Sequence, residues 1–311
     1  MKTCILFPGQ GAQYSGMGRD LFEASAKVKE LFVIASETTN LDTQKLLFEA
    51  SEEELKETDK TQVAVTLMNL AAATVLEEHG IVPDGCAGFS LGEYSALCIA
   101  GIIEVKDLFP LVKMRGEFME KASRNADTAG GNAGMAAVIG LAYDIAFQSL
   151  EQLHRSDVFI ANHTSPVQVV LAGTQEGLAA GAEAVKAAGA RRVIPLKVSG
   201  PFHTPLLQSA QEELEGLLSG ITFRDPGKTV YSNVTGGRIT SADEAKHLCV
   251  QQVTSSVLWV KEEQAIQADG YARYIEAGPG TVLKGLWKAF TDTSECRSAG
   301  KMEEIVQISE G

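Results

Sequence analysis

A short strand, a sharp turn and a buried helix are predicted around the sequence GFSLG at residues 88–92. The small and apolar residues that end at Ala87 suit a buried strand, and the apolar run after the motif indicates a helix that stops at Gly101. A G-x-S-x-G pattern in this setting lifts the serine clear of a sheet, and its glycines permit a strained backbone. The first amides of the helix point at Ser90 and favour negative charge there. The context favours a nucleophilic serine over the alternative, a tight glycine turn with an ordinary serine.

The composition is that of an ordinary globular protein. The chain has 311 residues, of which 45% are hydrophobic and 22% charged, enough for one large domain or about two of typical size. No run approaches the ~20 apolar residues that cross a bilayer, and the short apolar start lacks the features of a signal peptide. The five cysteines are scattered without metal-ligand spacing. We therefore expect a cytoplasmic protein with reduced thiols, no metal site and no membrane partner.

The charge balance also restricts the partners. The formal net charge is −13, which argues against nucleic acid or anionic lipid as the principal partner. The net charge does not argue against a small anionic substrate, because binding of such a molecule depends on the local charge at the site.

The chain begins and ends with alternating helices and short strands. A strand is expected at residues 3–7, followed by a glycine loop and helices from about residue 20, at about 61–79 and at about 105–122. Further strands are expected at 229–232 and 271–276. The polar tail after about Thr291 is expected to be loosely held.

A different pattern occupies the middle of the chain. Small residues at 125–134 predict a hinge or loop. Strands at 135–139, 158–162, 168–172 and 192–198 then alternate with helices at about 143–153 and 177–188. This order suits a small ferredoxin-like α+β module at residues 127–198, inserted into a larger α/β domain formed by residues 1–126 and 199–311.

Ordered motifs along nearly the whole chain carry a family resemblance. They are FPGQGAQ at 7–13, Gln62, the elbow continuing to Ala96, Arg115-Gly116, Asn162 with SPVQVV at 165–170, GPFHT at 200–204, SNV at 232–234, Gln252 and EAGPG at 276–280. Together they resemble the malonyl-CoA:acyl-carrier-protein transacylases of type II fatty-acid synthesis and of polyketide synthases. The resemblance implies an α/β-hydrolase-like large domain around the insert. It also implies malonyl-CoA and the phosphopantetheinylated acyl-carrier protein as substrates, no cofactor, and a monomer.

A serine nucleophile needs a base, and His203 is the best candidate among the five histidines. It follows a buried-looking strand and Gly200-Pro201, in a segment without regular periodicity, where a side chain can enter a cleft. From the residues alone, a structural role for His203 stays open. No carboxylate between Ser90 and His203 has a convincing loop setting. The resemblance implies a Ser-His dyad whose imidazole is oriented by the backbone carbonyl of Gln252.

An oxyanion hole needs two backbone donors. The helix start offers the amide of Leu91, and the resemblance adds the amide of Gln10. A dinucleotide site at this first loop is disfavoured, because the sequence after Gly9 and Gly11 lacks the third glycine of that motif.

Arg115 points to the class of substrate. An arginine in a largely apolar helix is awkward unless its guanidinium binds an anion, and its planar fork matches a carboxylate. A side chain that reaches solvent, or pairs with Glu117 or Glu120, is the alternative. The resemblance places Arg115 against the free carboxylate of malonyl and makes Phe202 the residue that prefers malonyl over methylmalonyl. It assigns pocket or supporting roles to the polar residues Gln62, Asn162, Asn233 and Gln252.

Two features are less settled by the sequence. Phe89 stands where the family usually has histidine, and we expect its side chain to point away from the serine. An acidic enzyme needs a local basic patch to bind an acidic carrier protein. Candidates are Arg191 with Arg192 and Lys197, or Lys284 with Lys288, although a solvated charged face explains either cluster as well.

The predicted function is therefore transfer of malonyl from malonyl-CoA to the carrier protein's phosphopantetheine thiol through a seryl acyl-enzyme. A stand-alone polyketide acyltransferase and a serine acyl hydrolase or editing thioesterase remain alternatives. A hydrolase of neutral acyl chains has no use for a buried cation at Arg115. The intact set of Ser90, His203 and Gln10 argues against a catalytically silent scaffold.

Overall fold

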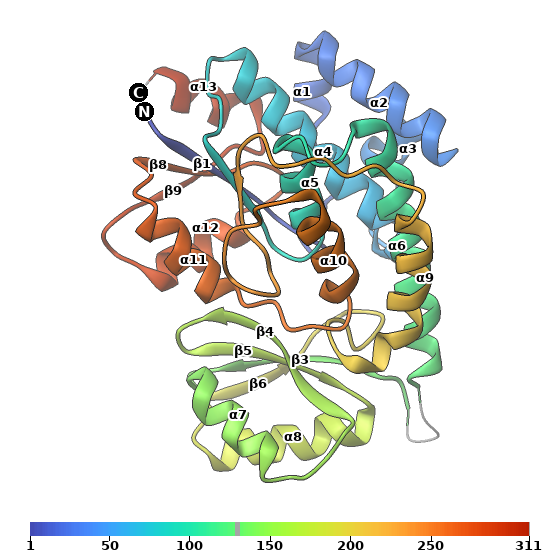
Figure 1. Ribbon diagram of the computed structural model, residues 1–311, viewed down its shortest axis with the longest axis vertical. Coiled ribbons are helices and arrows are strands. Elements are labelled where there is room, and N and C mark those ends of the chain that lie inside the picture. Colours follow the sequence, from blue (N-terminus) through green and yellow to red (C-terminus); the bar gives the residue numbers. More distant parts are fainter. Residues whose placement is uncertain (128–130, 311) are drawn as a thin grey trace.

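The computed structural model describes residues 1–127 and 131–310 and contains two separate sheets (Figure 1). The larger sheet has five strands in the order β7-β2-β1-β8-β9, and every neighbouring pair is parallel. Its central strand β1 is buried throughout, as expected where helices cover both faces of a parallel sheet. The strands are β1 (Thr3–Phe7), β2 (Gly85–Gly88), β7 (Thr229–Val230), β8 (Arg273–Glu276) and β9 (Cys296–Ser298).

Helices surround the parallel sheet. The longest of these include α4, which is buried along most of its length because its sequence is apolar nearly all round. These helices are α1 (Arg19–Ala24), α2 (Ala26–Thr39), α3 (Thr43–Phe48), α4 (Thr58–Glu78), α5 (Leu91–Ile99), α6 (Val105–Asn125), α9 (Gln208–Leu218), α10 (Ala242–Gln252), α11 (Trp259–Ala268), α12 (Val282–Phe290) and α13 (Met302–Glu310), with single 3-10 turns at Glu54–Lys56 and Pro205–Leu207.

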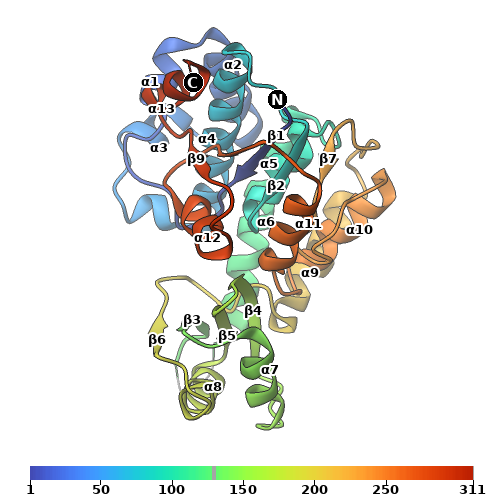
Figure 2. The same ribbon diagram turned by 90° about the vertical axis from the view of Figure 1, so that its left-hand side faces the viewer.

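The second sheet is antiparallel and lies at the end of the molecule remote from both chain termini (Figures 1 and 2). Its strand order is β4-β5-β3-β6, and it has an apolar cluster of its own. Its elements are β3 (Gly134–Ile139), α7 (Tyr143–Glu151), β4 (Val158–Ser165), β5 (Gln168–Gly173), α8 (Gln175–Ala187) and β6 (Arg192–Pro195). A mixed α/β fold with a parallel sheet and a separate antiparallel sheet confirms the coarse prediction. The predicted loop at 125–134 includes residues 128–130, which lie outside the described residues.

The prediction of a loosely held tail is wrong. Strand β9 extends the parallel sheet by pairing with β8, and Cys296 is buried there. Helix α13 then buries Ile305 and Ile308 against the main core. Two apolar residues three apart are a weak signal in a polar sequence, so only the packing partners reveal that this helix is held in place.

The carboxyl ends of the parallel strands bring the key loops to one edge. Strand β1 ends at Phe7 and leads into the loop that carries Gln10, and β2 ends at Gly88 and leads into the turn at Ser90. Strand β8 ends at Glu276, whose carboxyl group accepts the amide hydrogens of Leu283 (2.9 Å) and Lys284 (2.8 Å). This contact fixes the start of α12 at the same edge, where open α/β sheets commonly bind ligands.

Candidate active site

Ser90 sits on a strained turn between β2 and α5. Its φ is 52° and its ψ −109°, a backbone conformation that few residues other than glycine adopt. The turn is crowded, because a Cβ at Gly88 would lie 2.0 Å from the backbone of Gly92, and a Cβ at Gly92 would lie 2.0 Å from the carbonyl oxygen of Phe7. The two glycines of the motif are therefore required by close backbone packing.

The structure brings His203 to Ser90 from 113 residues away in the chain. The serine Oγ lies 2.6 Å from His203 Nε2, and His203 Nδ1 lies 2.8 Å from the carbonyl oxygen of Gln252. A carbonyl only accepts hydrogen bonds, so Nδ1 carries the hydrogen and Nε2 presents its lone pair to the serine. This arrangement lets His203 take the serine proton, and His203, like Ser90, has a positive φ (62°).

His203 stays neutral to unusually low pH. Burial, with a further contribution from the charge of Arg115, lowers the pKa of His203 to about 4. A base must be unprotonated, so we expect kcat/KM for acylation of Ser90 to stay level from about pH 8 to about 5 and to fall about tenfold per pH unit below about 4. Rapid-quench mass measurements of the acyl-enzyme across this range check it. A fall centred near the ordinary histidine value of about 6.5 would contradict it.

A cavity of about 220 Å³ opens beside Ser90 and His203. It lies between the edge of the parallel sheet and the antiparallel sheet, with contributions from α6 and α12. Leu91 and Gln10 both line it next to the serine, and Leu91 is the first residue of α5, so its amide hydrogen has no partner within the helix. The other lining residues are Phe89, Arg115, Met119, Met135, Asn162, Thr164, Gln168, Val170, Leu196, Val198, Phe202, Val282 and Leu286.

Arg115 lines this cavity although only 1% of its surface is exposed. Its guanidinium donates to the side-chain oxygens of Gln62 (2.9 Å) and Gln252 (3.0 Å) and lies over the ring of Tyr94 at 5.0 Å. Among the described residues, no carboxylate forms an ion pair with it, and its Nε has no hydrogen-bond partner. The alternative that Arg115 reaches solvent or pairs with Glu117 or Glu120 is wrong, since those acids pair with Lys113 and Arg124.

Gln252 connects the serine, the histidine and the arginine. Its carbonyl oxygen faces His203, its side-chain oxygen accepts from Arg115, and its side-chain nitrogen donates to the carbonyl oxygen of Ser90 at 3.0 Å. The side chain is fully buried at the end of α10. One residue therefore sets the relative positions of three groups that come from different elements.

The remaining predicted residues divide between the cavity wall and the layer behind it. Phe202 and Asn162 line the cavity, and both are largely buried. Gln62 lies behind Arg115 and contacts the sulfur of Met119. Asn233 lies behind the turn, where its side-chain oxygen accepts the amide hydrogen of Ser90 at 2.6 Å.

Phe89 is closer to the site than we expected. It lines the same cavity as Ser90, and its half-buried ring packs edge to face on Trp259 at 5.5 Å. Replacing Phe89 by histidine should lower stability by about 1 kcal/mol through the lost aromatic contact, and acyl transfer should stay within about tenfold, a ~1.4 kcal/mol effect. Thermal unfolding and steady-state transfer rates measure the two effects. A much larger loss of transfer would mean that this position shapes the catalytic geometry directly.

The sequence did not reveal three contributors to the site. Tyr94 supports Arg115 from α5, and no local pattern marks it. Val282 and Leu286 lie four apart on α12 and line the cavity. Their spacing marks an amphipathic helix and could have identified this face.

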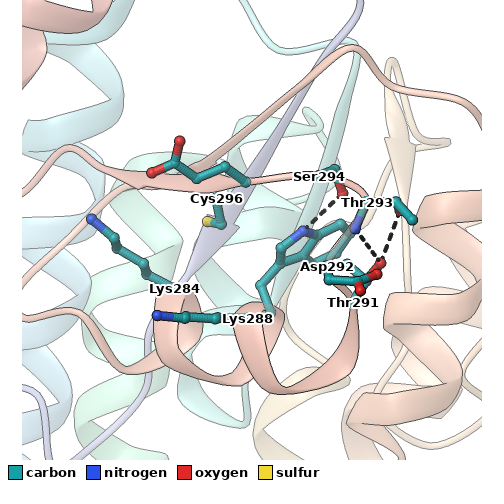
Figure 3. A pocket seen from close by; sticks show the side chains of 9 residues that line it. Lys284, Lys288, Thr291, Asp292, Thr293, Ser294 and Cys296 are labelled. Atoms are coloured by element: carbon teal, nitrogen blue, oxygen red, sulfur yellow. Dashed lines mark hydrogen bonds between the residues drawn. The ribbon is translucent and has the colours of Figure 1, made fainter.

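The lysines of α12 border a different hollow. Lys284 and Lys288 line a cavity of about 580 Å³ between α12 and the segment that leads to β9 (Figure 3). Asp292 and Glu295 line it too, so its charge is mixed. It contains none of the predicted catalytic residues, and we assign no function to it.

The described residues contain neither a membrane-spanning helix nor a metal-binding cluster. Within residues 1–127 and 131–310, no helix is long and apolar enough to span a membrane. In the same part of the chain, no group of three or more His, Cys, Asp or Glu side chains could hold a metal ion.

A serine and histidine poised beside a buried arginine, at the edge of a parallel sheet, define an enzyme that handles acyl groups. Residues 4–307 match the family described as "Acyl transferase domain". The chain therefore belongs to the acyl transferase family and is an acyltransferase.

Relatives within this family share one name. The chain is 38% identical over 289 residues to the malonyl CoA-acyl carrier protein transacylase of Bacillus subtilis, covering 92% of this chain and 90% of the relative. It is 38% identical over 294 residues to the enzyme of the same name from Escherichia coli K12, covering 94% of each. The crystal structure of MCAT from Streptococcus pneumoniae superimposes with a TM-score of 0.94 at 34% identity and 99% coverage of both chains. A malonyl-transacylase in complex with the type II PKS acyl-carrier protein AntF superimposes with a TM-score of 0.93 at 35% identity, covering 100% of this chain and 99% of that one.

Proposed function

We propose that this enzyme transfers the malonyl group from malonyl-CoA to the phosphopantetheine thiol of acyl-carrier protein. The observation that carries the proposal is the buried guanidinium of Arg115, whose hydrogen-bond partners among the described residues are neutral and which lines the cavity of Ser90 and His203. Burying a cation is costly unless an anion compensates it, so this cavity favours an acyl group with a free carboxylate. The names of the relatives, which are malonyl transacylases, support the same substrate.

In the first half of the reaction, malonyl moves from coenzyme A to the serine. His203 Nε2 takes the proton of Ser90 while Oγ attacks the thioester carbonyl. The amides of Gln10 and Leu91 donate to the oxyanion of the tetrahedral intermediate, and Arg115 holds the distal carboxylate. The intermediate collapses, the C–S bond breaks, and the departing thiolate takes the proton from His203. Malonyl is left as an ester on Ser90.

In the second half, the carrier protein's thiol replaces coenzyme A. Its proton passes to His203, the thiolate attacks the ester carbonyl, and the C–O bond to Ser90 breaks as Oγ recovers the proton. These steps use only groups of the chain and its two substrates, so we propose that no cofactor is needed. The backbone carbonyl of Gln252 orients His203 throughout, in place of the acid of a Ser-His-Asp triad.

Phe202 restricts the acyl group. It lines the cavity directly before His203, so its ring can occupy the space of an extra methyl on the malonyl carbon. Excluding one methyl in a pocket is worth ~1–3 kcal/mol, which makes malonyl preferred over methylmalonyl without strict exclusion. Gln62, Asn162, Asn233 and Gln252 support the pocket.

The proposal extends to the setting of the reaction. Malonyl supplied to a carrier protein serves as the extender unit of fatty-acid synthesis, and we propose that pathway for a cytoplasmic monomer. Five buried free thiols are consistent with a reducing compartment. Light scattering on the eluted peak of a sizing column tests the monomer.

We also propose a division of the chain into two domains. Residues 127–198 would form an inserted ferredoxin-like domain, which is supported by the strand order β4-β5-β3-β6 with helices α7 and α8 between the strands. Residues 1–126 and 199–311 would form an α/β-hydrolase-like domain, which is supported by the parallel sheet and the serine at the turn after β2.

Intact-protein mass spectrometry tests the function in two steps. The enzyme is first mixed with malonyl-CoA and then with phosphopantetheinylated acyl-carrier protein. We expect one malonyl adduct that maps to Ser90 and disappears as malonyl appears on the carrier. Free malonate without a carrier product would instead indicate a hydrolase, and no adduct with no turnover would refute the proposal.

A further inference from the structure

Three buried acids behind the nucleophile turn form no salt bridge with any of the described residues. Glu93 is 1% exposed, and Glu262 and Glu263 are fully buried on the first turns of α11. In each of them, one carboxyl oxygen has no hydrogen-bond partner among the described residues. Burying a carboxyl group costs free energy, which specific hydrogen bonds must offset.

Asn233 forms hydrogen bonds both with the turn at Ser90 and with two of these acids, Glu93 and Glu262. Its side-chain oxygen accepts the amide hydrogen of Ser90 at 2.6 Å, and its side-chain nitrogen donates to the carbonyl oxygen of Gly88 at 2.7 Å. The second hydrogen of that nitrogen goes to Glu262 Oε1 at 2.6 Å, and the backbone amide of Asn233 donates to Glu93 Oε2 at 2.9 Å. The side chain of Asn233 therefore bridges the backbone between Gly88 and Ser90, directly before the serine side chain.

The contact with Glu262 reinforces the orientation of the Asn233 side-chain amide that its two contacts with the turn require. Rotating the side-chain amide by half a turn would point its NH₂ group at the amide hydrogen of Ser90 and its oxygen at the carbonyl of Gly88, so both contacts would be lost. Glu262 Oε1 accepts a hydrogen from this nitrogen and stabilises the orientation seen. Since Ser90 has a strained backbone, its position depends on such surrounding contacts.

We propose that Glu262 is a positioning residue for Ser90 and acts through Asn233. The inference rests on the proposed role of Ser90 as the nucleophile. Glu262 touches neither the serine side chain nor the cavity, so it sets geometry and takes no part in proton transfer. Burial, with a further contribution from nearby Glu93, raises the pKa of Glu262 well above its usual range, which favours the protonated carboxyl.

The test compares Glu262→Gln with Glu262→Met in the full chain. Glutamine keeps the oxygen that accepts from Asn233 and resembles a protonated carboxyl, whereas methionine keeps the length and removes the acceptor. The matched control is Glu263→Met, because Glu263 is equally buried but accepts from the indole of Trp259 at 3.0 Å. Each variant is mixed with malonyl-CoA, the rate of the Ser90 adduct is followed by mass, and thermal unfolding is recorded.

We expect Glu262→Met to lower the maximal acylation rate ~10–100-fold, because small displacements of a reacting atom have effects of this size. The malonyl-CoA concentration at half-maximal rate should change less than about threefold, since the cavity itself is intact. Glu262→Gln and Glu263→Met should retain the maximal rate within about threefold, even where the unfolding temperature falls.

Either of two results would overturn the inference. One is a folded Glu262→Met variant with the full acylation rate, and the other is an equal loss in Glu263→Met, which would make the effect one of general stability. If Glu262→Met does not fold, Glu262→Ser is judged by the same criteria, because its hydroxyl is too short to reach Asn233. The unmodified chain separates the two proposals: its failure to form an adduct overturns the function as well, whereas a normal adduct with insensitive Glu262 variants overturns only the role of Glu262.

Discussion

Replacing Ser90 by alanine should remove the malonyl adduct and lower transfer by at least ~10⁴-fold, since loss of a nucleophile from a serine enzyme has effects of this order. The serine Oγ lies 2.6 Å from His203 Nε2, and no other hydroxyl in the described residues forms a hydrogen bond with this histidine. Ser90 is only half-buried, and alanine at the same turn meets no additional backbone strain, so the variant should fold normally. Intact-protein mass after mixing with malonyl-CoA measures the adduct.

Ser95→Ala is the matched control for this variant. Ser95 lies one turn further along α5, fully buried, and accepts a hydrogen bond from Asn69 at 3.1 Å. Its loss should cost about 1 kcal/mol of stability and leave the adduct in place. A Ser90→Ala protein that still carried malonyl would remove the assignment of the nucleophile.

Replacing Arg115 by alanine should reverse the preference between charged and neutral acyl groups. A buried, hydrogen-bonded charge pair is worth ~2–5 kcal/mol when one partner is removed, so kcat/KM for malonyl-CoA should fall ~30-fold to several thousand-fold. Acetyl-CoA has no carboxylate to hold, and its use should rise because the empty space no longer contains an unpaired cation. Rates with the two thioesters, measured side by side, give the ratio.

Arg115→Lys separates charge from geometry. Lysine keeps a positive charge but cannot donate to Gln62 and Gln252 while presenting a planar fork to the substrate. We expect an intermediate loss with malonyl-CoA and no gain with acetyl-CoA. An unchanged ratio in both variants would refute the carboxylate role and would reopen the hydrolase alternative.

Local chemistry made much of the fold predictable. The turn at Ser90, the long core helix now seen as α4 and the alternating strands and helices of the antiparallel sheet were all expected near their observed positions. Each rests on periodicity or on a glycine that the backbone requires, and these are properties of neighbouring residues. The prediction for the tail after about Thr291 was wrong because the order of this segment depends on residues far away in the chain. Helix α13 and β9 have weak patterns of their own and are held by a sheet edge and a core assembled from distant segments.

The functional site was likewise predictable from the sequence only in part. Ser90, His203 and Arg115 were identified by motif, by the setting of a lone histidine and by a cation in an apolar helix. The sequence could not show that Gln252 joins all three through its backbone carbonyl and its side chain, or that Asn233 is held between Glu93 and Glu262. Nothing near Glu262 in the chain distinguishes it from a solvated acid on a polar helix, and only its burial makes it unusual.

The residue order alone thus specified a serine on a glycine-rich turn, because steric limits on φ and ψ act between adjacent residues. Tertiary packing alone placed His203 beside that serine and buried Arg115 against Gln62 and Gln252, with no ion pair to a carboxylate among the described residues. It also lowered the pKa of His203 to about 4, since desolvation and charge interactions sum over all the groups that surround a buried side chain. Short segments of the sequence therefore supply the chemical groups, and the reactivity of these groups arises from contacts between segments more than a hundred residues apart.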